Sequence, residues 1–474
     1  MQPIDIAIVV VFLLGNILLG LFQGKSNKNN SDYFLGGHRL PWLVAMLSIV
    51  ATETSVLTFV SVPGLAYRGD WTFLQLPLGY ILGRILVSFI LLPAYFEKGV
   101  SSIYEIIGTR FGKGMQRFAS VVFLLTRILG DGIRFLATGV VVQVVTGWSL
   151  PFAVTVIGIV TLIYTISGGL KTVVWLDSIQ FGLYLLGGVA SIVFILLQLD
   201  ADPLSVMQSL AASGKLSMID TEGNVLFKPM VFGSAFAGGI FLSFASHGID
   251  YMMVQRVLGC SDLGAARKAM IGSGLFVFFQ FMVFLLAGSL MYLFMQGMAT
   301  EKDREFATFI VSYLPSGLKG LLLAGILSAA MSTIASSINS LAASTVTDLL
   351  GGKVSLFTSK AISAGWAFVL ISIALLFDES DKAIIMVGLE IASFTYGGLL
   401  GLFLLSKSKR RFRQMSLAIA LLASMGIVFV LKLYGIAWTW YIVISSAINI
   451  IIAYMSDSLF DLLDPEKSIS GEKK

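Results

Sequence analysis

The chain contains few of the residues that metal-binding and many catalytic sites need. Among its 474 residues are one cysteine, Cys260, and two histidines, His38 and His247. A single cysteine excludes an intrachain disulfide, and so few cysteines and histidines argue against a zinc site. Charged residues are also scarce, at 12% of the chain, whereas 57% of the residues are hydrophobic. Because soluble domains carry about a quarter charged residues, this composition indicates a membrane protein.

Long hydrophobic runs fill most of the chain. About 20 consecutive apolar residues are enough to cross a bilayer, and this criterion predicts about thirteen membrane-spanning helices and no soluble domain. The predicted spans are 4–22, 41–67, 72–95, 115–146, 150–167, 173–198, 232–256, 265–297, 316–347, 358–378, 383–405, 415–434 and 438–457. We therefore expect an all-α, multi-pass protein in a lipid bilayer. Neither this architecture nor the net charge of +5 indicates a nucleic acid partner.

Lysine and arginine residues predict the orientation of the chain. When the segment after the first span is placed in the cytoplasm, most Lys and Arg residues fall on the cytoplasmic side, as the positive-inside rule requires. The N-terminus is then outside the cell and the C-terminus is cytoplasmic, in the plasma (inner) membrane. Three arginines remain inside the spans: Arg84, Arg127 and Arg134.

Two predicted spans contain small and hydroxylated residues in mid-membrane. These are 41–67, with Ala-Thr-Glu-Thr-Ser at 51–55, and 232–256, with glycines at 238–239 and Ser-Phe-Ala-Ser-His-Gly at 243–248. Such residues allow a membrane helix to unwind, and the freed carbonyl groups can then coordinate a cation. The same residue types also serve close helix packing. With the first span set aside, the two breaks fall in helices one and six of ten, the pattern of two inverted five-helix repeats with a site at the midplane.

A third span carries a row of hydroxyl groups. Ser332 and Ser336 lie four residues apart and therefore share one helix face, and Thr333 flanks it. Hydroxyl oxygens beside a free carbonyl suit a monovalent cation such as Na⁺, whereas a divalent ion would demand carboxylates. A packing surface remains the alternative for this row.

Four stretches of the sequence resemble those of a known family. They are 164–180, which reads Tyr-Thr-Ile-Ser-Gly-Gly-Leu-Lys-Thr-Val-Val-Trp-Leu-Asp-Ser-Ile-Gln, together with 320–348, Val254-Gln255-Arg256 and 392–401. In these stretches the chain resembles the sodium:solute symporter family. The resemblance implies a LeuT-like fold, with a 5+5 inverted-repeat core, one extra N-terminal helix and two extra C-terminal helices.

The resemblance also implies a division of the chain and a function. The expected segments are 1–40 (N-terminal helix and first cytoplasmic loop), 41–198 (first repeat), 199–231 (extracellular loop), 232–405 (second repeat) and 406–474 (two C-terminal helices and tail). The expected protein is a secondary active transporter, not an enzyme, that imports a small polar organic solute with Na⁺ by alternating access. A monomer is expected to suffice. Coupling to protons through Glu53 or Asp177 stays open as an alternative, as does, in a different class, a membrane sensor or intramembrane enzyme.

The same resemblance implies sodium ligands. The first sodium site is expected at the carbonyl groups of Ala51, Thr54 and Ala329 and the hydroxyl groups of Ser332 and Thr333. A second sodium site is implied at Asp177, Ser332 and Ser336. Ala335, however, stands where two-sodium members can have another hydroxyl, so the number of ions stays open. Asp177 has a second interpretation, as a carboxylate beside Lys171 at a helix entrance.

Polar residues at the breaks or inside the spans are the candidates for solute contacts, because charges at bilayer depth are costly unless they are paired or hydrated. The candidates are Glu53, Ser55, Thr58, Gln75, Arg127, Asp131, Arg134, Ser243, Ser246 and His247. Asp131 lies four and three residues from the two arginines, so the three form either a self-neutralised cluster or a grip for a substrate carboxylate. Glu53 contacts the solute or turns toward Arg84, and His247 lines the pocket or is simply buried. These charges favour a charged or zwitterionic solute, but do not identify it.

Overall fold

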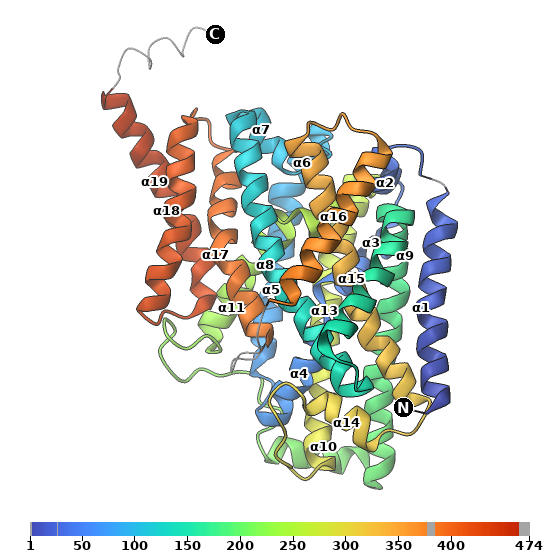
Figure 1. Cartoon of the computed structure of the whole chain (residues 1–474). Coiled ribbons are helices and arrows are strands. Elements are labelled where there is room, and N and C mark those ends of the chain that lie inside the picture. Colours follow the sequence, from blue (N-terminus) through green and yellow to red (C-terminus); the bar gives the residue numbers. More distant parts are fainter. Residues whose placement is uncertain (1, 26, 377–383, 464–474) are drawn as a thin grey trace.

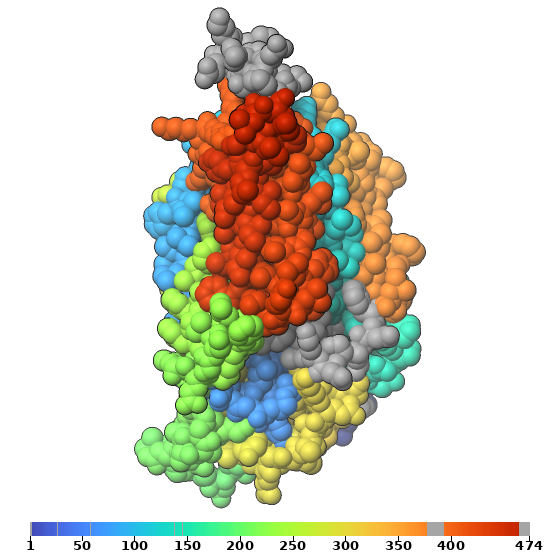
Figure 2. All heavy atoms as spheres, turned by 90° about the vertical axis from the view of Figure 1, so that its left-hand side faces the viewer, coloured from blue at the N-terminus to red at the C-terminus, as the bar shows by residue number. Residues whose placement is uncertain are grey.

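The protein is an elongated bundle of helices. The computed structural model describes residues 2–25, 27–376 and 384–463. Within these ranges all regular structure is helical, apart from one isolated bridge between Leu40 and Cys260. Helix α1 (Pro3–Gly24) lies on one flank of the bundle, and α18 (Gln414–Leu433) and α19 (Tyr441–Leu463) lie on the opposite flank (Figure 1). Figure 2 shows α18 and α19 as a continuous column on that flank.

Most helices are long and apolar enough to cross a membrane. Eight helices of the described ranges meet this criterion, or ten when each bent pair counts as one span. Besides α1, α18 and α19, the long elements of the bundle, most of which meet the criterion, are α5 (Gln75–Leu86) with η3 (Val87–Leu91) and α6 (Leu92–Lys98), α8 (Lys113–Thr146), α9 (Leu150–Leu199), α13 (Leu263–Phe294), α15 (Leu318–Ser344) with η4 (Thr345–Leu349), α16 (Leu356–Ala374) and α17 (Ile384–Leu405). Short helices are α2 (Asn30–Leu35), η1 (Gly36–His38), η2 (Thr72–Leu74), α7 (Tyr104–Phe111), α10 (Pro203–Ala212), α14 (Glu305–Tyr313) and η5 (Trp438–Trp440). The predicted total of thirteen spans and the predicted segment bounds stay predictions.

Both predicted helix breaks are present. Helices α3 (Trp42–Glu53) and α4 (Val56–Arg68) are bent by 60° relative to each other, and α11 (Phe232–Gly248) and α12 (Tyr251–Leu258) by 61°. The second break, however, lies after the predicted run 243–248, because α11 stays helical to its end. The glycines at 238–239 lie inside α11, where a Cβ on Gly239 would meet the Leu76 carbonyl oxygen at 2.2 Å. They serve helix packing, which was the alternative interpretation.

Helix α9 contains two predicted spans, 150–167 and 173–198. Its 50 residues correspond to about 75 Å, more than twice the thickness of a bilayer core. The helical conformation is interrupted at Gly169, whose φ is +64°. A Cβ there would also meet the Tyr33 carbonyl oxygen of α2 at 2.5 Å. Glycine is therefore required at this position both by the backbone angle and by the close approach of α2.

Helix α15 is the central helix of the bundle and is buried almost throughout. It packs against α9, α8, α3 and α1. The carboxylate of Asp5 on α1 accepts hydrogen bonds from the amides of Gly317 (2.8 Å) and Gly320 (2.9 Å), so α1 caps the N-terminus of α15. This arrangement holds the N-terminal end of α15 against α1.

Helix α10 lies within the predicted extracellular loop. Beyond it, Lys215 donates a hydrogen bond to the carbonyl of Tyr67, at 2.7 Å, and its ammonium lies 3.8 Å from the centre of the Tyr292 ring. Burial lowers the pKa of the Lys215 ammonium. The ammonium group stabilises the exposed carbonyl end of α4, as expected for a cation at a helix C-terminus.

Candidate functional site

The break between α3 and α4 frees backbone carbonyl groups toward α15. The amide of Ser55, which would continue the helix by donating to the Ala51 carbonyl, donates instead to the Glu53 carbonyl at 3.1 Å. Thr54 between them has φ −89° and ψ 76°, outside the helical range. The break thus leaves the C-terminal end of α3, with its partial negative charge, inside the bundle.

Two hydroxyl groups of α15 face this break. The Thr333 hydroxyl lies 3.4 Å from the Thr52 carbonyl and 3.2 Å from the Ala329 carbonyl, so it joins the two helices. The neighbouring Ser332 hydroxyl is buried and lies beside the Asp177 carboxylate of α9, but it accepts no hydrogen bond in the described ranges. A buried hydroxyl that accepts no hydrogen bond keeps its lone pairs available to an ion.

The break is held on its other side by α13 and α9. The Thr54 side chain donates to the Gln280 side-chain oxygen at 3.1 Å, and the Tyr184 hydroxyl donates to the same oxygen at 3.2 Å. This pairing fixes the backbone at the break. The structure therefore places Thr333 and Ala329 of α15 beside the break that contains Ala51 and Thr54, where carbonyl and hydroxyl oxygens are the available ligands. That ligand set suits a monovalent cation.

One turn along α15 is a second, different cluster, around Asp177 of α9. Its carboxylate accepts hydrogen bonds from Ser48 (2.6 Å) and Thr52 (3.4 Å) and forms an ion pair with Arg256, at 3.2 Å. The Arg256 guanidinium also donates to the Ser48 hydroxyl (2.8 Å) and to the Ser336 hydroxyl. Asp177 and Ser336, two of the residues implied for a second sodium, are thus bridged by an arginine.

Glu53 lies at the end of α3 and pairs with a buried arginine. Its carboxylate contacts the Arg84 guanidinium of α5 and lies 3.6 Å from the His247 ring nitrogen Nε2. Arg84 is further held by the Ser273 hydroxyl at 2.6 Å, and the other His247 nitrogen bonds to Ser246 at 2.9 Å. Of the two orientations open to Glu53, the structure shows the one toward Arg84, with 15% of the side chain still exposed.

Arg127 on α8 is fully engaged by protein groups. It pairs with Asp131 on its own helix and with Asp250, at 2.9 Å, which caps the start of α12. The Tyr396 hydroxyl donates to the same Asp250, and the Ser337 hydroxyl donates to Asp131. This network ties α8 to α12, α15 and α17 and matches the predicted self-neutralised cluster.

Arg134, the second arginine of that helix, is held far less tightly. Its Nη1 lies 3.7 Å from Asp131, without a hydrogen bond, and 18% of the side chain is exposed. It lies near the hydroxyl groups of Tyr80 and Tyr396. A guanidinium with unused donors can bind a carboxylate through two parallel hydrogen bonds.

The remaining solute candidates differ in whether they lie near the helix breaks or are bonded to a loop. Ser55 and Thr58 are buried at the start of α4, and Ser243 donates to the Tyr80 carbonyl at 3.1 Å. Gln75, in contrast, is engaged by the loop before α11. It donates to the Met230 carbonyl at 2.7 Å and accepts from an amide of the same loop at 3.2 Å.

Several residues that contribute to these clusters were not among the predicted site residues. Thr52 and Gln280 hold the break, and Asp250 and Arg256 complete the two ion-pair clusters. Asp250 carries a recognisable signal, since an aspartate before a helix is a common N-cap. Arg256 lay in a stretch used for the family resemblance. Its partner, however, is 79 residues away in the chain, so the pairing depends on the tertiary structure.

Comparison with known proteins identifies a family model, the sodium:solute symporter family, that matches residues 33–414. The sodium/sialic acid symporter SiaT of Proteus mirabilis (strain HI4320) is 29% identical over 345 residues, which cover 71% of this chain and 69% of the relative. The sodium-coupled monocarboxylate transporter 1 of Xenopus laevis is 27% identical, with coverage of 84% and 67%. The solved structure of a Na⁺-coupled sialic acid symporter in a substrate-bound outward-open state matches with a TM-score of 0.86 at 24% identity, covering 97% of this chain and 98% of that one. These likenesses confirm the predicted all-α, LeuT-like fold class.

Proposed function

Because the chain belongs to the sodium:solute symporter family, and is a multi-pass, sodium-coupled symporter of a small organic solute rather than an enzyme, we propose that its solute is an organic anion and that the sodium ion binds at the α3–α4 break. The observation that carries the sodium site is the pair of hydroxyls on α15. Thr333 reaches across to α3, and the buried Ser332 hydroxyl accepts no hydrogen bond in the described ranges. Carbonyl groups of Ala51, Thr54 and Ala329 complete the proposed ligand set.

Charge balance supports an anionic solute. In the described ranges, the buried carboxylates beside the two breaks are each paired with arginine: Glu53 with Arg84, Asp131 and Asp250 with Arg127, and Asp177 with Arg256. Arg134 adds a second, looser partner to Asp131. The four arginines and four carboxylates of these described ion pairs neutralise one another, so a sodium ion adds a positive charge that none of them compensates, in a poorly solvated place. A bound anion would neutralise it.

We assign the carboxylate contact to Arg134, since its guanidinium has unused donors. The polar groups proposed to meet the rest of the solute are Ser55, Thr58, Ser243, Ser246 and His247, whereas Glu53 is held by Arg84. Arg127 and Asp131 instead hold four helices together, and Gln75 holds a loop, so these three are not placed in the pocket. The names of two relatives, a sialic acid symporter and a monocarboxylate transporter, also denote acids.

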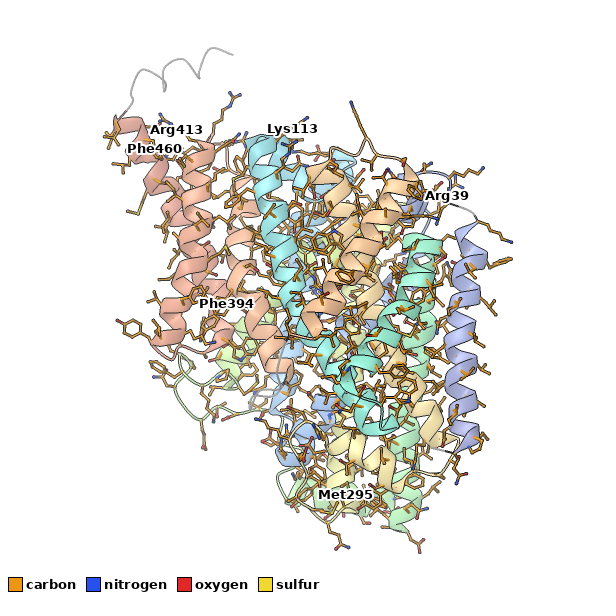
Figure 3. All side chains as sticks on the ribbon, in the orientation of Figure 1. Arg39, Lys113, Met295, Phe394, Arg413 and Phe460 are labelled. Atoms are coloured by element: carbon orange, nitrogen blue, oxygen red, sulfur yellow. The ribbon has the colours of Figure 1, made fainter. Side chains whose placement is uncertain are left out.

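We further propose that uptake occurs across the plasma membrane with the N-terminus outside. The labelled basic residues Arg39, Lys113 and Arg413 all lie at one end of the bundle, opposite Met295 (Figure 3). A basic end is expected on the cytoplasmic side. One chain contains both breaks and the sodium and solute candidates, so a monomer is the proposed transport unit. We do not propose proton coupling, because Glu53 and Asp177 are each paired with arginine.

A thermal-shift screen tests this proposal. The purified protein is heated with monocarboxylates, keto acids, acidic sugars and amino acids, each beside its neutral amide or alcohol, in NaCl and in choline chloride. A ligand at about 100 times its dissociation constant stabilises a protein by about 2.7 kcal/mol. We expect an acid to stabilise the protein in NaCl and its neutral analogue to have no effect. Equal stabilisation by the neutral analogue would contradict the anion, and equal stabilisation in choline chloride would contradict the sodium site.

A further inference from the structure

We propose that the Arg256 guanidinium takes the place of a second sodium ion, so that the protein couples one sodium ion to each solute molecule. The inference rests on the proposed function, because it presumes that sodium binds at the neighbouring break. It concerns the cluster around Asp177, where the family resemblance left the number of ions open.

The guanidinium lies between the groups that a second sodium would need. It pairs with the Asp177 carboxylate at 3.2 Å and donates to the hydroxyl of Ser336. Its Nε donates to Ser48 at 2.8 Å, and Ser48 in turn donates to Asp177 at 2.6 Å. A further donation to the Met252 carbonyl fixes the arginine to its own helix, α12.

The hydroxyl oxygens of this cluster already accept hydrogen bonds. Ser336 accepts from Arg256 and lies 3.3 Å from the Thr52 hydroxyl, which itself lies 3.4 Å from Asp177. Sodium binds through oxygen lone pairs, so an ion here would have to break several of these hydrogen bonds. Ala335 adds no further oxygen.

The charges of the cluster are also satisfied. Asp177 and Arg256 are 1% and 0% exposed and form a neutral pair. A sodium ion added to this pair would leave one positive charge unneutralised in a fully buried place, which is strongly unfavourable. At the α3–α4 break, in contrast, no cation is present among the described protein groups in contact with Thr333, and the carboxyl end of α3 supplies partial negative charge.

Two serines on the same face of α15 allow the α3–α4 break and the Asp177 cluster to be compared directly. Ser332 and Ser336 are one helical turn apart and both are 1% exposed. The Ser332 hydroxyl lies beside the Asp177 carboxylate but accepts no hydrogen bond in the described ranges, whereas the Ser336 hydroxyl accepts one from Arg256. If only one sodium binds, the two serines should respond differently to the same substitution.

Binding of radiolabelled sodium to the purified full-length protein tests the inference. We expect one ion per chain and a titration without cooperativity. Ser332→Ala should weaken binding at least tenfold, while Ser336→Ala should leave both the affinity and the number of ions unchanged. Two ions per chain, or an equal loss of affinity in both variants, would overturn the inference. The absence of saturable sodium binding would instead contradict the proposed sodium site itself.

A third variant tests the arginine directly. Arg256→Ala leaves the Asp177 carboxylate buried without a counter-charge, so we expect it to bind a second sodium ion, while the double variant Asp177→Asn, Arg256→Ala should return to one. A count of one ion in a folded Arg256→Ala protein would contradict the substitution of arginine for sodium. If this variant does not fold, the number of sodium ions bound by the wild-type protein and the comparison of Ser332→Ala with Ser336→Ala still test the inference.

Discussion

Two polar clusters lie one turn apart on α15 and differ in what their oxygen atoms contact. At the α3–α4 break, Thr333 bridges to a freed carbonyl, and the Ser332 hydroxyl accepts no hydrogen bond in the described ranges. Around Asp177, the carboxylate and the Ser336 hydroxyl are both occupied by Arg256. The comparison teaches that a row of hydroxyls indicates an ion site only where lone pairs remain unused and charge remains uncompensated.

The largest effect is expected from breaking the occupied cluster. Asp177→Asn keeps the shape of the side chain but leaves Arg256 buried without its counter-ion, and removing one partner of a buried pair costs about 3–5 kcal/mol. We expect the free energy of unfolding in detergent to fall by this amount. Asp262→Asn is the matched control, because Asp262 caps α13 at an exposed position, through a 2.9 Å bond to Ala265. A loss as small as that of the control would contradict the role of the pair.

The same contrast between occupied and unused groups is found in the arginines of α8. Arg134→Gln should weaken binding of the acid found in the screen by about ten- to a hundredfold, the equivalent of 1.5–3 kcal/mol for a charge-assisted hydrogen bond. Its effect on thermal stability should be small. Arg127→Gln should instead lower stability, since it leaves Asp250 and Asp131 without their shared partner. Solute affinity equal to that of the wild type in Arg134→Gln would exclude this arginine from the pocket.

The smallest effect is expected at the N-terminal cap of α15, the helix that contributes residues to both clusters. Asp5→Ala removes the cap that α1 provides to α15, which should lower the free energy of unfolding by about 1 kcal/mol. Sodium affinity, measured by titration of the variant, should change by less than about twofold, because α15 remains anchored by packing along its length. A large loss of sodium affinity would show that the position of the hydroxyl row depends on this cap.

The sequence predicted those features that depend on local pattern. Hydroxyl and small residues at 51–55 marked the first break, and the i, i+4 spacing of Ser332 and Ser336 placed them on one face. The second break was located less well, because glycines at 238–239 serve close packing as readily as unwinding.

The partner of each charged group could not be read from the sequence. Asp131 and Arg127 are four residues apart and were predicted to pair, but the contact of Arg127 with Asp250 spans 123 residues. The contacts of Arg256 with Asp177 and Ser336 likewise arise only when α12, α9 and α15 pack together. The number of unused lone pairs at each cluster, on which the sodium proposal depends, is therefore a property of the tertiary structure.

Sodium titration of the double variant Ser332→Ala, Thr333→Ala tests the central claim most directly. Sodium-induced stabilisation is measured against Ser328→Ala. Ser328 is a buried serine one turn earlier on α15, and its hydroxyl bonds, within the described part of the chain, only to the Ala324 carbonyl of its own helix, at 2.7 Å. We predict that the double variant is no longer stabilised by sodium, whereas Ser328→Ala responds as the wild type does. Sodium stabilisation that survives in the double variant at wild-type concentrations would contradict the site at the α3–α4 break.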